Sequence, residues 1–458
     1  MKKTGLAGIL FGITLVAGFY VSSFFLPKTI TIWPIAALTE PAQPSLAIAP
    51  EEHPGSYYLP GYESLRDRFL LEGRKFLEIN FFEMKVRAYE NGALAKEVSI
   101  LRKGDPQGWG GSPAGLYSVI LKNKNGYSSI AEVFMPYSLK LYGKYYLHGE
   151  PFYPSGEKLI SDFSGGCIQL SDENAKEIYE LVNEAEAVLI VDKENDGFVY
   201  SEKSRSSFPE ISAKGYLVAD IDSGFIFAAK NENESLPIAS LTKLMTAVVV
   251  AENVDLRRSI FVSEEMVNRG YGSTTGLEKG EEFRVVELFY PLLTESSNDA
   301  AEALGGFLGR ERTINLMNSK AKKIMMENTS FSDLSGFGEK NVSTTKDFYY
   351  LLRYIYNNRP PILDITKGEK VNTYGGVRFK DLWNKNVFYE DPDFIGGKTG
   401  YIAASKYNGA FIFRFIDESG NERKVAIIIL GAEAFRMGGS SLRADTQKIY
   451  GWLKENYF

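Results

Sequence analysis

The chain has 458 residues, which at roughly 150 residues per domain predicts two large domains or three smaller ones. Its composition, 44% hydrophobic and 24% charged, is typical of globular proteins and excludes both a disordered chain and a polytopic membrane protein. With 52 Lys and Arg against 58 Asp and Glu, the net charge is −6, which argues against nucleic acid as the main partner.

The rare residues limit the available chemistry. The chain has one cysteine, Cys167, and two histidines, His53 and His148. A single cysteine excludes an intramolecular disulfide and a multi-cysteine zinc site. Because no histidine follows His148, a nucleophilic serine in the C-terminal half needs another kind of base. We expect neither a metal nor a cofactor.

The N-terminal segment favours a membrane anchor. Residues 5–26 are uncharged and, at about 1.5 Å per residue, long enough to cross a hydrocarbon core of roughly 30 Å. Lys2 and Lys3 precede them, so we expect a signal-anchor transmembrane helix within residues 1–30 and the catalytic domains on the extracytoplasmic side of the cell membrane. A cleaved signal peptide is the alternative. Prolines concentrated in residues 33–60 predict an extended spacer, which we place at residues 31–75.

A β-rich domain is expected at residues 76–193, followed by a polar linker at 194–212. Alternating apolar residues predict strands at 80–101, 116–121 and 130–141, the first containing a hairpin turn at Glu90-Asn91-Gly92. Ser171 is a suitable N-cap for a helix at 172–185, and a strand at 187–191 follows it.

This domain contains both the thiol and one imidazole. Cys167 lies in Ser164-Gly165-Gly166-Cys167-Ile168-Gln169-Leu170, shortly after His148. A neighbouring imidazole takes the thiol proton and lowers the thiol pKa, so this pair is sufficient for acyl transfer. Gly165 and Gly166 let the backbone pass close to a substrate and leave amides free to hold an oxyanion. The alternative is that Cys167 is a small apolar residue of the core.

The Cys167 motif, with His148-Gly149, Gly111-Ser112-Pro113-Ala114-Gly115 and Met135-Pro136-Tyr137, resembles the catalytic domain of the L,D-transpeptidase family (YkuD type) over about residues 78–192. The resemblance implies Cys167 as nucleophile, His148 as base, and a backbone carbonyl near His148-Gly149 that orients the ring. It implies substrate-binding positions at Gly149, Gly165 and Gly166. Two positions depart from the family pattern: Gly165 stands where His is often found, and Gln169 where Arg is common. The second departure concerns recognition of the donor carboxylate.

An α/β (α+β) domain with an antiparallel sheet and a helical cluster is expected at residues 213–458. Two strands joined by Asp222-Ser223-Gly224 open it, helices follow, and two strands and a helix close it, so one edge of the sheet is completed late. The predicted strands are 216–220, 225–229, 408–416 and 424–430, and the predicted helices are 241–252, 285–293, 300–308 and 440–457.

The most apolar of these helices begins with Ser240-Leu241-Thr242-Lys243. Lys243 lies on the same helix face as Ser240, and burial or a second cation lowers the pKa of such an amine until it acts as a base. This spacing alone is not specific, since it also occurs at Ser155, Ser319 and Ser343. Specificity comes from the ordered set, in which Ser296-Ser297-Asn298 precedes a helix and Lys398-Thr399-Gly400 opens a strand.

The ordered set resembles the serine D-alanyl-D-alanine carboxypeptidases among the low-molecular-mass penicillin-binding proteins (peptidase S11 type), whose motifs class A β-lactamases share. The resemblance implies Ser240 as nucleophile and Lys243 as its base. Its further implied roles are a proton relay at Ser296, amide binding at Asn298, carboxylate binding at Lys398 and Thr399, and an oxyanion hole of the Ser240 and Tyr401 backbone amides beside Gly400. Glu311 is a weak candidate for the deacylating glutamate of a β-lactamase.

Together the two resemblances imply a bifunctional peptidoglycan-remodelling enzyme. The serine domain removes the terminal D-Ala of pentapeptide stems, and the resulting tetrapeptide is the donor that the cysteine domain cross-links at high local concentration. Stem peptides are the expected partners and β-lactams the expected covalent inhibitors. The alternatives are a β-lactamase-like or D,D-endopeptidase serine domain with a cysteine domain that only trims or binds cell wall, and an inactive wall-binding scaffold.

Overall fold

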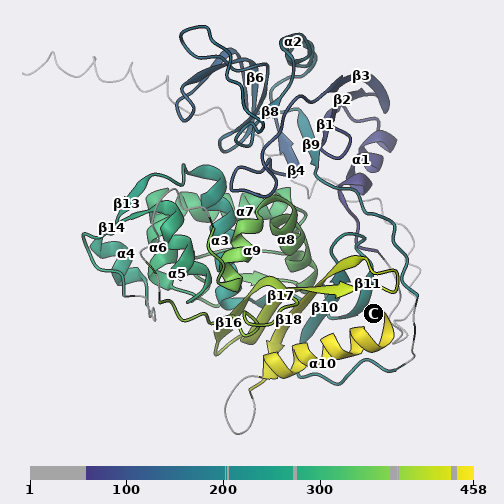
Figure 1. Cartoon of the computed structure of the whole chain (residues 1–458), viewed down its shortest axis with the longest axis vertical. Helices are drawn as coiled ribbons and strands as arrows, with labels where there is room; N and C mark the ends of the chain where they lie inside the picture. Colours follow the sequence, from purple (N-terminus) through teal and green to yellow (C-terminus); the bar gives the residue numbers. More distant parts are fainter. Residues whose placement is uncertain are drawn as a thin grey trace, which may run out of the picture. The chain divides into compact units, whose positions relative to one another are not determined.

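A computed structural model describes residues 58–201, 203, 206–271, 276–371, 379, 381–434 and 441–458 (Figure 1). The expected anchor at residues 1–30 and most of the expected spacer at 31–75 lie outside these ranges. Across the described ranges, no helix is both long and apolar enough to cross a membrane.

The β-rich domain consists of a five-stranded and a four-stranded sheet with two helices. Its elements are α1 (Tyr62–Leu71), β1 (Phe76–Asn80), β2 (Lys85–Glu90), β3 (Ala93–Ser99), β4 (Gly115–Ser118), β5 (Leu121–Ser128), β6 (Val133–Tyr142), β7 (Tyr145–His148), β8 (Ile168–Gln169), α2 (Asp172–Leu181) and β9 (Ala187–Val191). The strand orders are β3-β2-β1-β9-β4 and β5-β6-β7-β8. The pairs β1–β9 and β7–β8 are parallel, and apolar side chains of both sheets and of α2 form one core.

Turn and capping residues set several boundaries in this domain. Asn91 and Gly92 both have positive φ, 53° and 73°, and form the predicted hairpin turn between β2 and β3. The Ser171 side chain accepts a hydrogen bond from the Asn174 backbone N–H and caps α2 as predicted. The helix ends at Leu181 and not at 185, because Val182 is already extended.

Two predictions for this domain were wrong. The strand predicted at 116–121 belongs to two sheets, since the chain leaves the first sheet after β4 and enters the second at β5. The segment predicted as spacer up to residue 75 contains α1, whose Tyr62 and Phe69 are buried. Phe69 packs edge-on against Phe76 of β1, with ring centroids 5.3 Å apart, so α1 is anchored to the domain.

The second domain is built on a five-stranded antiparallel sheet of order β11-β10-β18-β17-β16. Its strands are β10 (Gly215–Asp220), β11 (Ile226–Lys230), β12 (Leu236–Pro237), β13 (Ser259–Phe261), β14 (Glu282–Arg284), β15 (Val342–Ser343), β16 (Phe394–Ile402), β17 (Lys406–Ile416) and β18 (Glu422–Ala432). Its helices are η2 (Ala239–Leu241), α3 (Thr242–Asn253), α4 (Glu264–Arg269), η3 (Val285–Leu288), α5 (Phe289–Leu293), α6 (Asn298–Phe307), α7 (Arg310–Lys323), α8 (Thr345–Asn358), α9 (Pro360–Lys367) and α10 (Ser441–Asn456).

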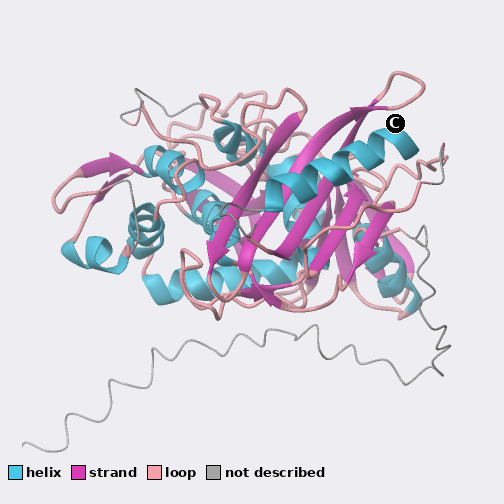
Figure 2. Ribbon diagram, turned by 90° about the horizontal axis from the view of Figure 1, so that it is seen from below, coloured by secondary structure: helices cyan, strands magenta, loops and turns pink. Residues whose placement is uncertain are grey.

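The two faces of this sheet are covered by different helices. Figure 2 shows α10 crossing one face of the strands, with other helices on the opposite side. Along β18 the side chains alternate: Ile427 and Ile429 pack in the cluster that contains α10, whereas Ile428 packs in the larger core with α3 and α8. The predicted antiparallel sheet is confirmed. As predicted, strands from late in the chain complete it, and one of them, β16, forms an edge.

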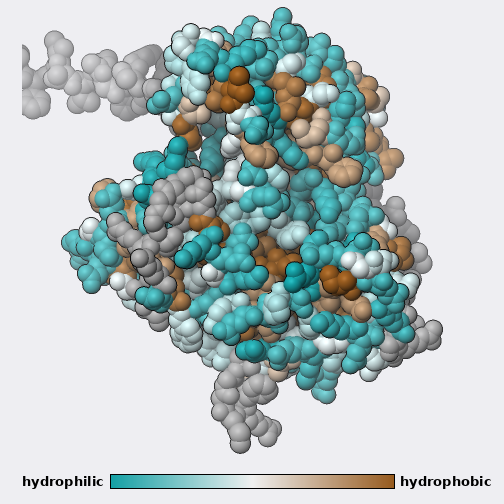
Figure 3. Space-filling view, in the orientation of Figure 1, coloured by the Kyte–Doolittle hydropathy of each residue, from teal (hydrophilic) through white to brown (hydrophobic). Residues whose placement is uncertain are grey.

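The helix predicted at 285–293 is instead a 3₁₀ turn, η3, followed by the short α5. Pro291 has no backbone N–H to donate to the Glu287 carbonyl, which interrupts a continuous α-helix here. The 14-residue helices α7 and α8 and the shorter α9 were not predicted at all. The exterior seen in Figure 3 is mainly hydrophilic, with hydrophobic residues in separate patches.

The polar segment 194–212 packs against the second domain over its described residues. Arg423 forms an ion pair with Asp196 at 2.6 Å and donates to Asp220, which also accepts from the Tyr200 hydroxyl. The Trp452 indole N–H donates to the Ser206 carbonyl at 3.0 Å. The segment is therefore held along the domain by specific contacts.

Candidate active sites

The serine motifs converge on a cleft of about 690 Å³, within the size range of small-molecule sites. Its lining includes Ser240, Ser296, Asn298, Thr399, Gly400, Tyr401, Phe337 and Lys385. The first six were predicted from the ordered set, although their motifs lie far apart in the chain. The structure thus brings η2, the start of α6 and β16 to one place.

Lys243 lies between the other polar groups of this cleft. Its Nζ donates to Ser240 Oγ at 3.0 Å, to Asn298 Oδ1 at 2.8 Å and to the Ser335 carbonyl at 2.7 Å. Its side chain is fully buried, and this burial, with the nearby cation of Lys398, lowers the pKa of Lys243 well below its ordinary value. A neutral amine at hydrogen-bond distance from the hydroxyl is able to accept its proton.

The backbone at the nucleophile is strained. Ala239, which directly precedes Ser240, has a φ of 48°, a left-handed conformation that costs a non-glycine residue about 1–2 kcal/mol. Ser296 also has a positive φ of 62°, and among the described residues its buried Oγ has no hydrogen-bond partner. The Ser296 hydroxyl is therefore available to a group bound in the cleft.

Two lysines lie at or next to the β16 side of the cleft: Lys385 lines it, and Lys398 directly precedes the lining residue Thr399. Lys398 is fully buried and its Nζ donates to the Thr399 carbonyl at 2.8 Å. Burial, with the nearby Lys385, lowers the pKa of Lys398 to about 7. A Cβ on Gly400 would lie 2.9 Å from the Ser240 backbone nitrogen, so β16 passes directly beside the nucleophile and carries Tyr401 there. Lys385 was missed from the sequence because it belongs to none of the three motifs.

Glu311 does not belong to this site. It is exposed in the first turn of α7 and is not among the residues that line the cleft. The position predicted for a deacylating glutamate therefore offers no carboxylate to a group bound at Ser240.

The cysteine site lies at the parallel pair β7–β8. His148 is paired with Gln169 and Leu147 with Ile168, so Cys167 stands opposite Tyr146 on the same sheet face as His148. His148 Nδ1 donates to the Gly149 carbonyl at 2.6 Å, which leaves Nε2 as the acceptor. Burial lowers the pKa of His148 to about 4, so the imidazole is neutral.

The pKa of the Cys167 thiol differs from the expected one. Cys167 is half-buried, its Sγ donates to the Lys144 carbonyl at 3.9 Å, and burial raises the pKa of the thiol to about 11. The sequence predicted a lowered thiol pKa, which is wrong for this state because desolvation outweighs the neighbouring donors and cations. The thiol and the imidazole are both neutral and lie on the same sheet face, each bonded to a backbone carbonyl.

The two glycines before Cys167 differ in their surroundings. Both have positive φ, 69° at Gly165 and 116° at Gly166. A Cβ on Gly165 would meet open space, whereas one on Gly166 would lie 2.4 Å from the Tyr145 ring. Gly149 is also required by close packing, since a Cβ there would lie 2.4 Å from Asp172 Oδ1.

An arginine lies beside the position where the sequence departs from the transpeptidase pattern. The buried Gln169 accepts a hydrogen bond from Arg102 NH1 at 3.3 Å through Oε1, and among the described residues its Nε2 has no partner. Arg102 and Gln169 also pair as an antiparallel β-bridge. Arg102 was not predicted, because it is 67 residues away in the chain.

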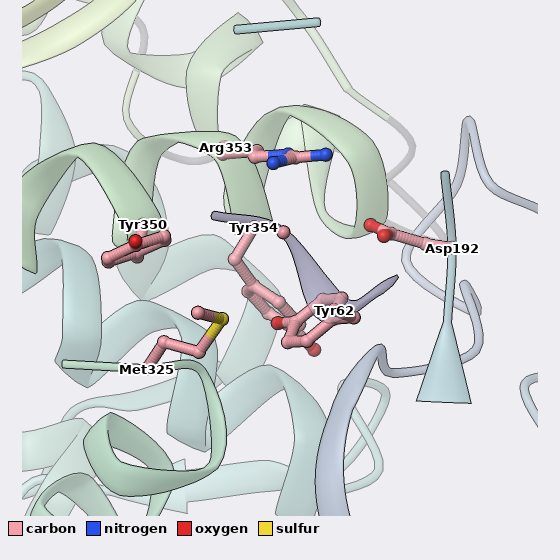
Figure 4. A pocket seen from close by; sticks show the side chains of 7 residues that line it. Tyr62, Asp192, Met325, Tyr350, Arg353 and Tyr354 are labelled. Carbon is pink, nitrogen blue, oxygen red and sulfur yellow. The ribbon is translucent and has the colours of Figure 1, made fainter. Parts of the chain in front are cut away.

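A second cavity lies between α1 and α8. Figure 4 shows Tyr350, Arg353 and Tyr354 projecting into it, with Tyr62 and Asp192 nearby. Its volume of about 10 Å³ corresponds to roughly one water molecule. It is too small for a peptide substrate.

Each of the two domains matches a known family. Residues 202–434 match the peptidase S11 family, D-alanyl-D-alanine carboxypeptidase, and residues 74–190 match the YkuD L,D-transpeptidase catalytic domain. The chain belongs to the peptidase S11 family and carries a YkuD domain before its S11 domain.

Individual relatives match about half of the chain. D-alanyl-D-alanine carboxypeptidase DacD of Escherichia coli (strain K12) is 26% identical over 54% of this chain and 65% of its own length, and DacF of Bacillus subtilis (strain 168) is 29% identical over 50% and 60%. A D-alanyl-D-alanine endopeptidase of Haemophilus influenzae is 33% identical over 44% of this chain and 70% of its own. The chain thus spans less than two thirds of the length of DacD and DacF.

Proposed function

We propose that the serine domain is a D,D-carboxypeptidase that removes the terminal D-Ala of pentapeptide stems. The observation that carries the proposal is the buried Lys243 amine, which lies 3.0 Å from Ser240 Oγ and has a strongly lowered pKa. Family membership supports the same reaction.

The reaction proceeds by acyl transfer through Ser240. Lys243 accepts the hydroxyl proton while Oγ forms a bond to the carbonyl carbon of the penultimate D-Ala, and the backbone amides of Ser240 and Tyr401 hold the oxyanion. The peptide C–N bond breaks, and the leaving amine takes a proton relayed by Ser296. Water then hydrolyses the ester. Lys398, Thr399 and Lys385 hold the terminal carboxylate, and Asn298 binds the substrate amide.

Labelling with a fluorescent penicillin tests this assignment. Parent protein should be acylated, and Ser240→Ala should lose the label completely. Ser155→Ala is the matched control, because Ser155 has the same spacing to a lysine but lies exposed outside the cleft. Persistent labelling of Ser240→Ala would overturn the assignment.

For the cysteine domain we propose an L,D-transpeptidase that uses the tetrapeptide product as its donor. The support is the Gly149-oriented His148 on the same sheet face as Cys167, together with the match to the YkuD family. His148 Nε2 takes the thiol proton as Sγ bonds to the donor carbonyl carbon. The C–N bond to the terminal D-Ala breaks, and the D-Ala amine leaves with the proton returned by His148. An acceptor amine then displaces the thiol.

We also propose that Arg102 replaces the arginine absent at Gln169. Its guanidinium and the unpartnered Gln169 Nε2 provide donors of the kind that bind a carboxylate. The product of the serine reaction carries a terminal carboxylate, which is the group these donors would hold.

A D,D-endopeptidase activity of the serine domain is the second candidate. The relative of that name is 33% identical and supports it. Digestion of D,D-cross-linked muropeptide dimers, compared with pentapeptide monomers on the same preparation, distinguishes the two. Release of free D-Ala from monomers with intact dimers supports the carboxypeptidase.

We further propose that residues 1–30 anchor the chain in the cell membrane, with both catalytic domains on the extracytoplasmic side where peptidoglycan lies. The uncharged segment after Lys2 and Lys3 is the support. Fractionation of cells that express the full chain, with and without residues 1–30, tests it.

A further inference from the structure

Helix α3 carries functional side chains at its beginning and a buried charged cluster at its end. Glu252, in its last turn, is fully buried and pairs with Arg359 NH2 at 2.9 Å and with Lys320 Nζ at 2.9 Å. It also accepts a hydrogen bond from the Tyr354 hydroxyl. These partners compensate the charge of the buried Glu252 carboxylate. The same contacts hold each partner in a defined position.

Both cations of this cluster also contact the β-rich domain. Arg359 donates from NH2 to the Tyr145 hydroxyl at 2.8 Å and from NH1 to the Gly111 carbonyl at 2.7 Å. Lys320 donates to the Tyr117 hydroxyl at 2.9 Å. In the opposite direction, Lys144 Nζ donates to the Ala251 and Val254 carbonyls at the end of α3, each at 3.0 Å.

The groups that bind Arg359 pack directly against the loop Gly165–Cys167, which we call the cysteine loop. The Tyr145 ring is the surface that a Cβ on Gly166 would strike. Next to the Gly111 carbonyl, Ser112 Oγ donates to the Gly166 carbonyl at 2.9 Å, and Gly110 lies against Gly165. The thiol itself donates to the carbonyl of Lys144, the neighbour of Tyr145.

We propose that Arg359, a residue of the serine domain, is a positioning residue of the cysteine site. By binding Tyr145 and the segment Gly110–Ser112, it holds the loop Gly165–Cys167 in the packed position that keeps the thiol half-buried. The cysteine site is thereby completed by a side chain from outside its own domain. The inference concerns the same site as the proposed transpeptidase, but its test does not depend on that activity.

Cys167 is the only cysteine of the chain, so alkylation by iodoacetamide reports on this site alone. Burial keeps the thiol pKa high. The charged or titratable groups facing the thiol are Lys144, Tyr145 and Tyr146, and His148 lies on the same sheet face. If the loop loosens, the thiol gains water and its pKa falls. The alkylation rate at pH 7 then rises about tenfold for each unit by which the pKa falls.

The full chain should be compared as parent, Tyr145→Phe, Arg359→Lys and the double variant. We expect alkylation at pH 7 to rise about tenfold in each single variant, with a lower midpoint of the pH profile. The double variant should be no faster than the faster single variant, because the two side chains act through one contact. Penicillin acylation of Ser240 should stay at the parent level, which shows that the serine domain is folded.

Tyr117→Phe is the matched control, because it removes a buried tyrosine hydroxyl that accepts from Lys320 and donates to the Ala114 carbonyl, and its ring packs on Tyr142. It should leave the alkylation profile unchanged. Parent-like alkylation in Tyr145→Phe, an additive double variant, or an equal effect of Tyr117→Phe would each overturn the proposal. Absence of L,D-transpeptidase activity in the parent would overturn the proposed function and leave this test intact.

Discussion

The two nucleophiles of this chain rest in different states, although both sites are shaped by burial. At the serine site the pKa of the base, Lys243, is strongly lowered, and its amine already lies 3.0 Å from Ser240 Oγ. At the cysteine site the pKa of the nucleophile is raised to about 11 and that of His148 is lowered to about 4. Desolvation favours the neutral form of every group, so it activates an amine base and suppresses a thiol nucleophile.

Removal of Lys243 should have the largest effect. Lys243→Ala leaves Ser240 without a proton acceptor, and no histidine lies in that half of the chain to replace it. We expect penicillin acylation to fall by about 10⁴-fold, almost as severe as the complete loss in Ser240→Ala, since nucleophile and base act as a unit. The acylation rate measures it, with Lys158→Ala as control. Parent-like acylation in Lys243→Ala would identify another base.

The second prediction concerns the raised pKa of the Cys167 thiol at the cysteine site. With a thiol pKa near 11, the alkylation rate of Cys167 should rise about tenfold per pH unit, so about a hundredfold between pH 7 and pH 9. His148→Ala should abolish transpeptidation but keep this slope, because His148 does not hold the thiol ionised. A plateau reached below pH 7 would mean a thiolate–imidazolium pair, and the contrast between the two sites would disappear.

The pH profile of the serine reaction tests the lowered pKa of Lys398. In the proposed mechanism Lys398 binds the substrate carboxylate only when protonated, and burial lowers the pKa of Lys398 to about 7. As pH rises through that value the cation is lost, so kcat/KM of the free enzyme should fall about tenfold by pH 8. Lys398→Arg keeps its charge at all these pH values and should remove the alkaline limb. A parent profile that is flat to pH 9 would contradict the role of Lys398.

The smallest predicted effect concerns Arg102. Arg102→Gln removes the cation beside Gln169, and we expect KM for the tetrapeptide donor to rise about fivefold with little change in kcat. Lys103→Gln is the control, because Lys103 is the adjacent cation but donates to the Phe81 carbonyl. Equal effects of the two substitutions would assign the change to general charge and not to donor recognition.

The sequence predicted what depends on local chemistry and fixed motif order. Ser171 caps α2, Asn91-Gly92 turns the hairpin, and the three serine motifs meet in one cleft as expected. It did not predict Arg102 beside Gln169, since that contact joins segments 67 residues apart. It also misjudged the Cys167 pKa, because burial is a property of the packed structure and not of the flanking residues.

The packed structure also explains the missed helix α7 and the interdomain contacts. Helix α7 has many charged residues and buries only a narrow stripe, so its apolar periodicity is weak. Arg359 is the single residue between α8 and α9. From the sequence an arginine there would be expected on the surface, yet Arg359 is fully buried. Its partners Glu252, Gly111 and Tyr145, from two domains, account for its position.

The central claim is that the two sites act in sequence, and product analysis of pentapeptide muropeptides tests it most directly. The parent chain should give tetrapeptides and L,D-linked dimers. Ser240→Ala should give neither from pentapeptide, yet cross-link tetrapeptide supplied directly, and Cys167→Ala should accumulate tetrapeptide without dimers. Dimers formed from pentapeptide by Ser240→Ala at the parent level, or tetrapeptide left unchanged by the parent chain, would contradict the sequential account.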